Sequence, residues 1–409
     1  METTDTSRAA GPVRVRPRGA AAALAALCVT VTTSYGVLFY AFPVLALPIT
    51  ADTGWPLVAT TAAFSLAQVV GALVGVPVGR WLDRYGPRTV MTLGAAVAAP
   101  ALAGIALAPD LWSFAAAWLV AGATMAALFY PPAFAALTRW YGPDRVRALT
   151  ALTLVAGLAS TIFAPLTAAL DGWLGWRGAY LVLAAVMLVV AVPLHALALR
   201  PPWTPAADAP PHDDAREPGT VRSVVLSPAF LALTGALTLG AFGVYAVPVN
   251  MVPLLDERGV AAGAAAWVLG VTGIGQVLGR LLYAPLDRHT GAATRLAAVL
   301  AVCALTTALL AAVPGPVSVL LAVSMLAGVG RGVFTLLHAT AVSDRWGTAR
   351  YGTLNGILHA PLSLVSAVAP AAGAFLAGLL GGYPALFALL AATAVAGVVL
   401  APLSRPSRG

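Results

Sequence analysis

Lysine is absent from this chain of 409 residues, so all 23 of its basic residues are arginines. Charge of either sign is scarce, because only 9% of the residues are charged, against about 25% in soluble domains. Hydrophobic residues reach 60%, and the mean hydropathy is +0.89. Too few polar side chains remain to cover a surface in water. The composition therefore predicts that lipid surrounds most of the chain.

The motifs of soluble catalysis are also missing. The two cysteines, Cys28 and Cys303, lie in apolar runs and indicate neither a disulfide framework nor a metal site. No glycine-rich phosphate loop with a lysine is present, which argues against an ATP-driven pump. The net charge of +8 comes from arginines spread through short loops, as in membrane proteins rather than nucleic-acid-binding ones. We therefore predict no enzyme activity, no cofactor, no metal and no nucleic-acid partner.

Long apolar runs are abundant, and twelve of them are suited to cross a membrane as helices of about 20 residues. They cover residues 20–47, 57–79, 89–108, 111–138, 148–170, 178–199, 229–250, 264–285, 295–313, 317–342, 353–380 and 383–403. The arginine-rich residues 1–19 resemble the start of a signal peptide, but the first run is too long for one. The expected fold is an all-α integral membrane protein with twelve transmembrane helices.

The arginines predict the orientation of these helices. If the N-terminus is cytoplasmic, only Arg177 and Arg258 fall in segments on the opposite side of the membrane. Because arginine concentrates in cytoplasmic loops, both termini are expected in the cytoplasm. The longest polar stretch, residues 200–228, is typical of a flexible linker. The predicted parts are a tail at 1–19, a six-helix bundle at 20–199, the linker at 200–228, a second six-helix bundle at 229–403 and a tail at 404–409.

Four short motifs recur in the second half at a nearly constant offset of about 205 residues. They pair Tyr40-Ala41-Phe42-Pro43 with Tyr245-Ala246-Val247-Pro248, Leu82-Asp83-Arg84 with Leu286-Asp287-Arg288, Arg139-Trp140 with Arg345-Trp346, and Ala164-Pro165 with Ala369-Pro370. Motifs that recur in register at equivalent topological places predict two pseudo-symmetric bundles. In such proteins the substrate site lies between the bundles, near the middle of the membrane.

The segment Gly79–Arg88, which reads Gly-Arg-Trp-Leu-Asp-Arg-Tyr-Gly-Pro-Arg, lies between the second and third runs. It resembles the signature loop of the major facilitator superfamily, and the resemblance extends over essentially the whole chain. The resemblance implies a gating motif made of Gly79, Asp83, Arg84, Gly86 and Arg88, with Asp287 and Arg288 as its second copy. It also implies that Asp83 contacts the facing end of helix 11 and neighbouring arginines, which latches the cytoplasmic side.

Within that superfamily the chain more closely resembles the monocarboxylate transporters. Tyr40-Ala41-Phe42-Pro43 is similar to their helix 1 signature, and Gly54-Trp55 stands where they often carry Ser-Trp. Arg280 matches the arginine of their helix 8 Asp-x-x-x-Arg pair, which implies binding of a substrate carboxylate, whereas Gln276 replaces the acid. Val44 replaces the lysine of animal members. Because that acid and lysine are linked to proton coupling in the family, the resemblance does not carry over a proton–lactate mechanism.

Arg280 and Arg331 fall inside predicted spans, whereas every Asp and Glu falls in a loop, a tail or a helix end. A charge at the bilayer centre costs about 2.5–3.5 kcal/mol even on insertion scales, so each arginine needs a partner or a wet cavity. The guanidinium groups either bind an anionic substrate or bond to backbone carbonyls and reach the membrane edge. The predicted substrate-binding residues are Arg280, Arg331, Tyr40, Tyr245, Asn250 and Gln276. Packing between helices is the alternative for the uncharged four.

Two histidines lie in the predicted helices 10 and 11, and histidine is the side chain whose ordinary pKa lies near neutral pH. His338 and His359 are therefore a candidate proton relay, with a purely structural role as the alternative.

These observations predict a secondary transporter that moves a small organic anion by alternating access, as a monomer in the plasma (inner) membrane. Exchange for a counter-anion, or facilitated transport, is physically simpler than proton symport because an unneutralised guanidinium hinders return of the empty carrier. The main alternative is a proton-coupled antiporter that exports drugs or metabolites. Against it, helix 4 lacks the arginine that such exporters often carry. A membrane sensor is a further alternative, but no tail or loop is long enough for an output domain.

Overall fold

The computed structural model describes residues 18–203, 218–346 and 351–405, and this part of the chain is helical apart from short connections. The helices of the first half are α1 (Ala20–Tyr35), α2 (Ala41–Thr53), α3 (Leu57–Ala106), α4 (Leu111–Leu128), α5 (Tyr130–Tyr141), α6 (Arg145–Ala156), α7 (Ala159–Val186) and α8 (Val192–Ala198). Those that follow are α9 (Pro218–Val225), α10 (Pro228–Glu257), α11 (Ala262–His289), α12 (Ala292–Ala312), α13 (Val317–Thr340), α14 (Ser343–Trp346), α15 (Tyr351–Leu380) and α16 (Tyr383–Leu400). Two π-helical turns, Gly36–Tyr40 and Met187–Ala191, join α1 to α2 and α7 to α8.

Eleven helical stretches within the described residues are long and apolar enough to cross a membrane. The longest, Arg147–Ala198, has 52 residues, or roughly 78 Å of helix, against a bilayer core of about 30 Å. Gly175 breaks this stretch with a non-helical φ of 69° and ψ of 170°. Gly86 breaks α3 in the same way, with φ 77° and ψ 168°. Breaks at single glycines thus replace the longer loops expected at 80–88 and 171–177.

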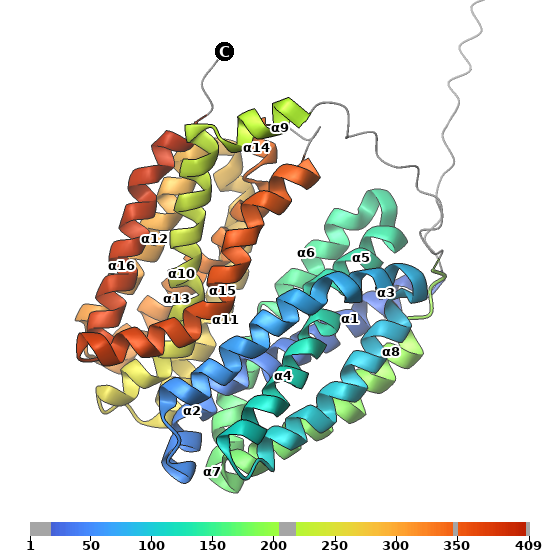
Figure 1. Cartoon of the computed structure of the whole chain (residues 1–409), viewed down its shortest axis with the longest axis vertical. Coiled ribbons are helices and arrows are strands. Elements are labelled where there is room, and N and C mark those ends of the chain that lie inside the picture. The colour runs from blue at the N-terminus through green and yellow to red at the C-terminus, as the bar shows by residue number, and fades with distance from the viewer. Residues whose placement is uncertain (1–17, 204–217, 347–350, 406–409) are drawn as a thin grey trace, which may run out of the picture.

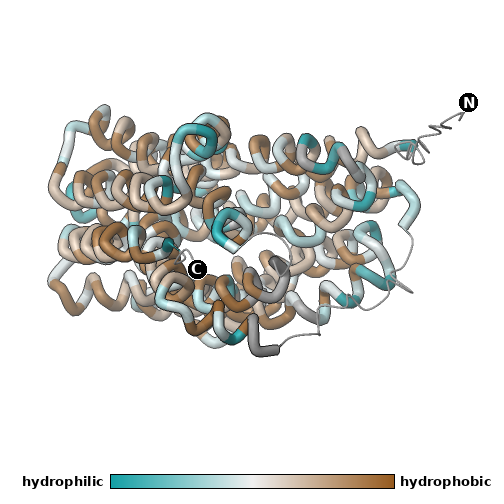
Figure 2. The backbone as a smooth tube through the Cα atoms, turned by 90° about the horizontal axis from the view of Figure 1, so that it is seen from above, coloured by the Kyte–Doolittle hydropathy of each residue, from teal (hydrophilic) through white to brown (hydrophobic). Residues whose placement is uncertain are grey.

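Hydrophobic residues run along the helices throughout the molecule (Figure 2), and many of their large side chains are exposed. Leu93, Val189 and Val399 are large and apolar, yet each is at least 60% exposed. In water a contiguous surface of this kind is unfavourable, whereas lipid chains are as apolar as leucine. The distribution of side chains therefore agrees with the composition: this is a multi-pass membrane protein.

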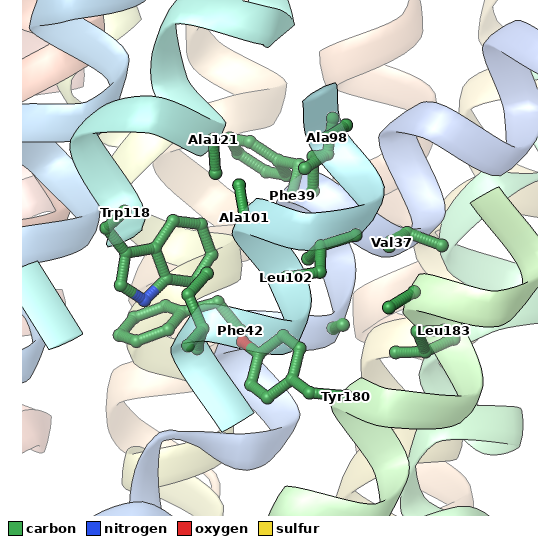
Figure 3. Close-up of a cluster of buried hydrophobic side chains, with 14 of the residues drawn as sticks. Val37, Phe39, Phe42, Ala98, Ala101, Leu102, Trp118, Ala121, Tyr180 and Leu183 are labelled. Carbon is green, nitrogen blue, oxygen red and sulfur yellow. The ribbon is translucent and has the colours of Figure 1, made fainter. Parts of the chain in front are cut away.

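Aromatic rings form the core of the first half (Figure 3). Phe42 of α2 stacks on Phe64 of α3 with 4.4 Å between ring centroids. Both rings lie almost at right angles to Trp118 of α4, and so does Tyr180 of α7. Three consecutive helices and the more distant α7 are therefore held around one centre.

The two halves form two groups of helices, α1–α8 and α10–α16, that lie side by side (Figure 1). They touch where α3 packs against α15 and where α7 packs against α11. Thr161 Oγ1 donates to the Gly270 carbonyl at 2.8 Å, and the Ala371 amide donates to Ser65 Oγ at 3.0 Å. Toward the end of the molecule that carries α9 and α14, the groups diverge (Figure 1).

The Gly79–Arg88 segment is helical on both sides of Gly86 and lies at the diverging end. Asp83 Oδ1 accepts a hydrogen bond from Arg139 Nη2 at 3.2 Å, and Trp203 Nε1 donates to the Asp83 carbonyl at 3.1 Å. The Arg139 guanidinium lies 4.1 Å from the centre of the Trp203 ring. Among the described residues, the hydrogen bonds and ion pairs of Asp83 stay within this half and do not reach α15. In this state Asp83 therefore bonds to Arg139 of the first half and to Trp203 just after it.

The second copy of the motif makes different contacts. Arg295, whose side chain is only 4% exposed, pairs with Asp287 Oδ1 at 2.6 Å and also with Asp344. Arg345, the repeat equivalent of Arg139, donates to the Ser404 carbonyl at 2.9 Å. The repeated Leu-Asp-Arg sequence is thus embedded in two unlike networks.

The other residues of the gating motif lie at the same end of the molecule. Arg88 Nε donates to the Ala196 carbonyl of α8 at 2.8 Å, and Arg84 lies 5.2 Å from the Tyr85 ring centre. Gly79 lies within the helical part of α3, and Arg288 is exposed in the last turn of α11.

The predicted linker, residues 200–228, contains more structure than a flexible connection. Helix α9 falls within it, and Val221, Val224 and Val225 pack against the core of the second half. Residues 204–217 lie outside the described part of the chain.

Replacing Gly86 with Ala is expected to destabilise the protein by about 2 kcal/mol, because its backbone region is essentially restricted to glycine. A Cβ at this position would also lie 2.9 Å from Trp203 Cγ. In a Trp203→Ala background the same substitution should cost less stability, because the contact with the ring is absent and only the backbone strain remains. Thermal unfolding of the detergent-solubilised variants measures both effects. Gly79→Ala is the matched control, since a Cβ there meets nothing within 4 Å, and an equal loss in this control would contradict the prediction.

Candidate functional site

Four glycines bring α11 and α13 into backbone contact. A Cβ on Gly275 or Gly279 would overlap a backbone oxygen of α13, and a Cβ on Gly328 or Gly332 would overlap one of α11. Small residues four positions apart allow membrane helices to approach this closely. Gln276 and Arg280, which follow two of these glycines on α11, are thereby brought close to α13, which carries Arg331.

Arg331 of α13 lies against one tyrosine from each half. Its guanidinium carbon is 5.9 Å from the ring centre of Tyr40 and 5.8 Å from that of Tyr245. These tyrosines are equivalents in the internal repeat, so the cation lies close to the pseudo-symmetry axis. Cation–π attraction stabilises the charge without neutralising it. Arg331 Nη1 is buried and makes no hydrogen bond within the described part of the chain.

Gln276 connects the same cluster across the halves. Its Nε2 donates to the Tyr40 hydroxyl at 3.4 Å, and its side chain is almost fully buried. An uncharged amide of the second half therefore contacts a tyrosine of the first half.

Arg280 reaches from α11 into the first half. Its Nη1 donates to the Thr153 carbonyl of α6, and its side chain interacts with Tyr130 of α5. Gly157 leaves the necessary space, because a Cβ there would lie 2.8 Å from Arg280 Nη1. The carbonyl contact is of the kind expected for a structural arginine. However, Arg280 Nε is buried and has no hydrogen-bond partner among the described residues.

Two further tyrosines join this centre, and sequence reasoning did not select them. Tyr35 stacks on Phe129 at 4.0 Å and lies 4.9 Å from the Tyr130 ring. The Pro131-Pro132 pair starts α5 after a break at Phe129, and Tyr130 at this start interacts with Arg280. A proline pair inside an apolar run was the available sequence signal. Tyr35 carries no comparable sequence signal.

Asn250 does not join the cluster. Its Nδ2 donates to the Ala246 carbonyl at 2.9 Å and to the Pro370 carbonyl at 3.4 Å, and the residue is buried. It links α10 to α15.

His338 of α13 and His359 of α15 face each other directly, with 2.9 Å between His338 Nδ1 and His359 Nε2. Both line a cavity of about 290 Å³, to which Gln68 of α3 and Tyr245 of α10 also contribute. The cavity therefore has walls from both halves.

The arrangement suits an anion. Arg280 and Arg331 supply two guanidinium groups, and among the described residues neither forms an ion pair with a carboxylate. Tyrosine hydroxyls and the Gln276 amide surround these charges. A search of the described residues finds no group of three or more histidines, cysteines or acids placed to hold a metal ion.

The chain is similar in sequence to a family of known proteins. A family model for the Major Facilitator Superfamily matches residues 27–319 and 233–409. Monocarboxylate transporter 13 of Bos taurus is 28% identical over 341 residues, which cover 79% of this chain and 75% of that protein. Monocarboxylate transporter 11 of Homo sapiens is 30% identical over 233 residues, covering 56% and 47%. A chloramphenicol efflux pump of Mycobacterium tuberculosis is 32% identical over 227 residues, covering 54% and 52%.

A solved structure confirms the fold. A bacterial homologue of the human lysosomal transporter Spinster, in an inward-facing and unoccupied conformation, matches with a TM-score of 0.73 over 95% of both chains. Its sequence identity of 17% supports a common fold and no more. The sequence resembles that of the monocarboxylate transporters, and the molecule is a membrane transporter of small molecules rather than an enzyme. The chain belongs to the Major Facilitator Superfamily.

Proposed function

We propose that the protein is a secondary transporter that moves a small organic anion of the monocarboxylate type by alternating access. The observation that carries this proposal is the pair of guanidinium groups, Arg280 and Arg331, held where the two halves meet. Each has a buried nitrogen without a hydrogen-bond partner among the described residues. A carboxylate binds a guanidinium through two parallel charge-assisted hydrogen bonds, so an anionic substrate satisfies this need.

The names of the relatives support an anionic substrate. Two of them are monocarboxylate transporters, and the match to transporter 13 covers most of both chains. Tyr40, Tyr245 and Gln276 then surround the bound carboxylate, while Asn250 braces the helices that hold it.

The proposed topology has twelve spans with both termini in the cytoplasm. Division of the 52-residue stretch at Gly175 yields two crossings of ordinary length. The arginine-rich connections then lie at the diverging end of Figure 1, which becomes the cytoplasmic end. The bundles are residues 20–199 and 229–403, and the protein acts as a monomer in the plasma membrane.

Alternating access requires that contacts at one end of the halves exchange for contacts at the other. The bonds between Thr161 and Gly270 and between Ser65 and Ala371 hold the halves together in the present state. In the outward-facing state the end that diverges in Figure 1 is closed, and α15 then lies nearer to Asp83. The Gly79–Arg88 segment can act as a latch in that state.

Export of a drug is the second candidate. It is favoured by the similarity to the chloramphenicol efflux pump and to a fungal fujikurins efflux protein. The two unpaired guanidinium groups argue against cationic drugs, because like charges repel, and leave acidic products open.

Counterflow in liposomes tests the proposal. Purified protein is reconstituted with unlabelled lactate, pyruvate or benzoate inside, and uptake of the same labelled compound is followed. We expect uptake above that of protein-free liposomes for at least one carboxylate. No counterflow with any carboxylate, together with cellular resistance to cationic dyes on overexpression, would support the exporter instead.

A further inference from the structure

An open groove of about 640 Å³ lies on the first half, between α4 and the two parts of α3 on either side of Gly86. Trp81 and Tyr85 line it from the part before Gly86, and Leu93 and Val97 line it from the part after. Each of these four side chains is at least 45% exposed. A large apolar surface that is open in this way marks a contact with lipid or with another protein.

The groove has one end at the membrane surface. Trp81 and Tyr85 lie close to the helix break at Gly86, and this break is at the diverging end of the molecule (Figure 1). Tryptophan and tyrosine concentrate where the membrane meets water. Val97 lies eleven residues beyond Gly86, or roughly 16 Å along the helix. The groove therefore runs from the interface toward the membrane interior, as a lipid does.

Unpaired positive charge is present at the interfacial end. Arg80 and Arg84 are exposed and lie one helical turn apart, and neither forms an ion pair among the described residues. The Arg84 guanidinium lies over the Tyr85 ring, at 5.2 Å from its centre. The neighbouring acid, Asp83, pairs with Arg139 instead. Like charges four residues apart destabilise a helix, so an anion between Arg80 and Arg84 would relieve this repulsion.

The second half contains an equivalent groove that lacks most of these features. It has a volume of about 450 Å³ and lies among α11, α12 and α13. When the repeated Leu-Asp-Arg motifs are aligned, Pro285 and His289 take the places of Trp81 and Tyr85, and an alanine takes the place of Arg80. Helix packing thus accounts for a groove in each half. The aromatic rings and the second arginine of the first groove need a separate reason.

We propose that the groove of the first half binds an anionic phospholipid. Its phosphate lies between Arg80 and Arg84, and one of its acyl chains follows Leu93 and Val97. Guanidinium groups bind phosphate oxygens through paired hydrogen bonds, whereas the choline group of a zwitterionic lipid would be repelled. Each arginine near an anionic lipid contributes about fivefold to binding, so two arginines should give a preference of about tenfold or more.

Trp81 can report on the occupant directly, because bromine atoms on an acyl chain quench a tryptophan that touches the chain. The full-length protein is reconstituted in phosphatidylcholine liposomes that contain a minor fraction of brominated phosphatidylglycerol. The difference between the wild type and Trp81→Phe isolates the signal of one among ten tryptophans. We expect this signal to be quenched as if phosphatidylglycerol were enriched about tenfold at the groove. Brominated phosphatidylcholine with the same chains should quench only in proportion to its bulk fraction.

The charge is tested by substitution. Arg80→Gln combined with Arg84→Gln should abolish the enrichment, and an unchanged enrichment in this variant would overturn the assignment of the phosphate. Arg145→Gln combined with Arg147→Gln is the matched control. It removes the same charge from exposed positions of α6 outside the groove, and it should keep the wild-type enrichment.

Two further outcomes would also overturn the proposal. Equal quenching by the two brominated lipids would mean that the groove holds ordinary surrounding lipid without selection. Relief of quenching by added glycerol phosphate, which has the headgroup chemistry without the chains, would identify a free phosphate ester as the ligand. None of these measurements involves transport, so the lipid site and the proposed anion transport can fail separately.

Discussion

Replacing Arg280 with Gln is expected to slow carboxylate counterflow by about 100-fold or more. Hydrogen bonds to charged groups contribute about 1.5–3 kcal/mol each, and a carboxylate makes two with one guanidinium. Because about 1.4 kcal/mol corresponds to tenfold, losing both bonds exceeds 100-fold. Arg280→Lys retains the charge but not the fork, so an intermediate loss of about tenfold is expected. Initial rates of labelled uptake in liposomes measure both variants.

Folding must be separated from binding in this experiment, since Arg280 also bonds to the Thr153 carbonyl. The thermal unfolding midpoint of each purified variant reports any structural loss. Arg222→Gln, at an exposed position in α9, is the matched control for removal of one positive charge and should transport as wild type. Wild-type transport by Arg280→Gln would end the assignment of this arginine to the anion site.

Gly275→Val is expected to lower the thermal unfolding midpoint by about 4 °C or more. Overpacking usually costs about 1–3 kcal/mol, and this site should exceed that range because a Cβ meets the Met325 carbonyl oxygen, which belongs to a helix backbone. The helices α11 and α13 must separate, which also moves Arg280 away from Arg331. Tryptophan fluorescence during heating of the detergent-solubilised protein measures the effect.

Gly263→Val is the matched control on the same helix. A Cβ at Gly263 meets nothing within 4 Å, so the same substitution should change the midpoint by no more than about 1 °C. Gly279→Ala provides a smaller insertion at the same contact, since its Cβ would overlap the Val329 carbonyl oxygen. Equal midpoints for Gly275→Val and Gly263→Val would show that the close packing of α11 and α13 does not support the fold.

Much of the architecture could be predicted because the membrane restricts the choices. In lipid, every backbone polar group must be bonded internally, so long apolar runs become helices. The prediction of helices was confirmed, and the superfamily resemblance carried by Gly79–Arg88 was also confirmed. The turns were less predictable, since Gly86 and Gly175 break helices within segments that the sequence suggested were loops.

Some features of the candidate site could likewise be predicted from the sequence, and others could not. The composition of the spans identified Arg280 and Arg331, because buried charges without nearby acids are rare and costly in membranes. The repeat identified Tyr40 and Tyr245 as equivalents. No spacing rule could show that both rings flank one guanidinium, since this depends on how two bundles dock.

The sequence by itself therefore determined that lipid surrounds this protein, that the chain is helical and that its two halves repeat. It also identified Arg280 and Arg331 as charges that need a partner. Local composition and periodicity are sufficient for these properties. Only the tertiary structure decided that Arg280 reaches Tyr130, that His338 meets His359, and that Asn250 bonds to the Pro370 carbonyl. These contacts join residues on different helices, and their geometry follows from close packing between helices, which no local pattern encodes.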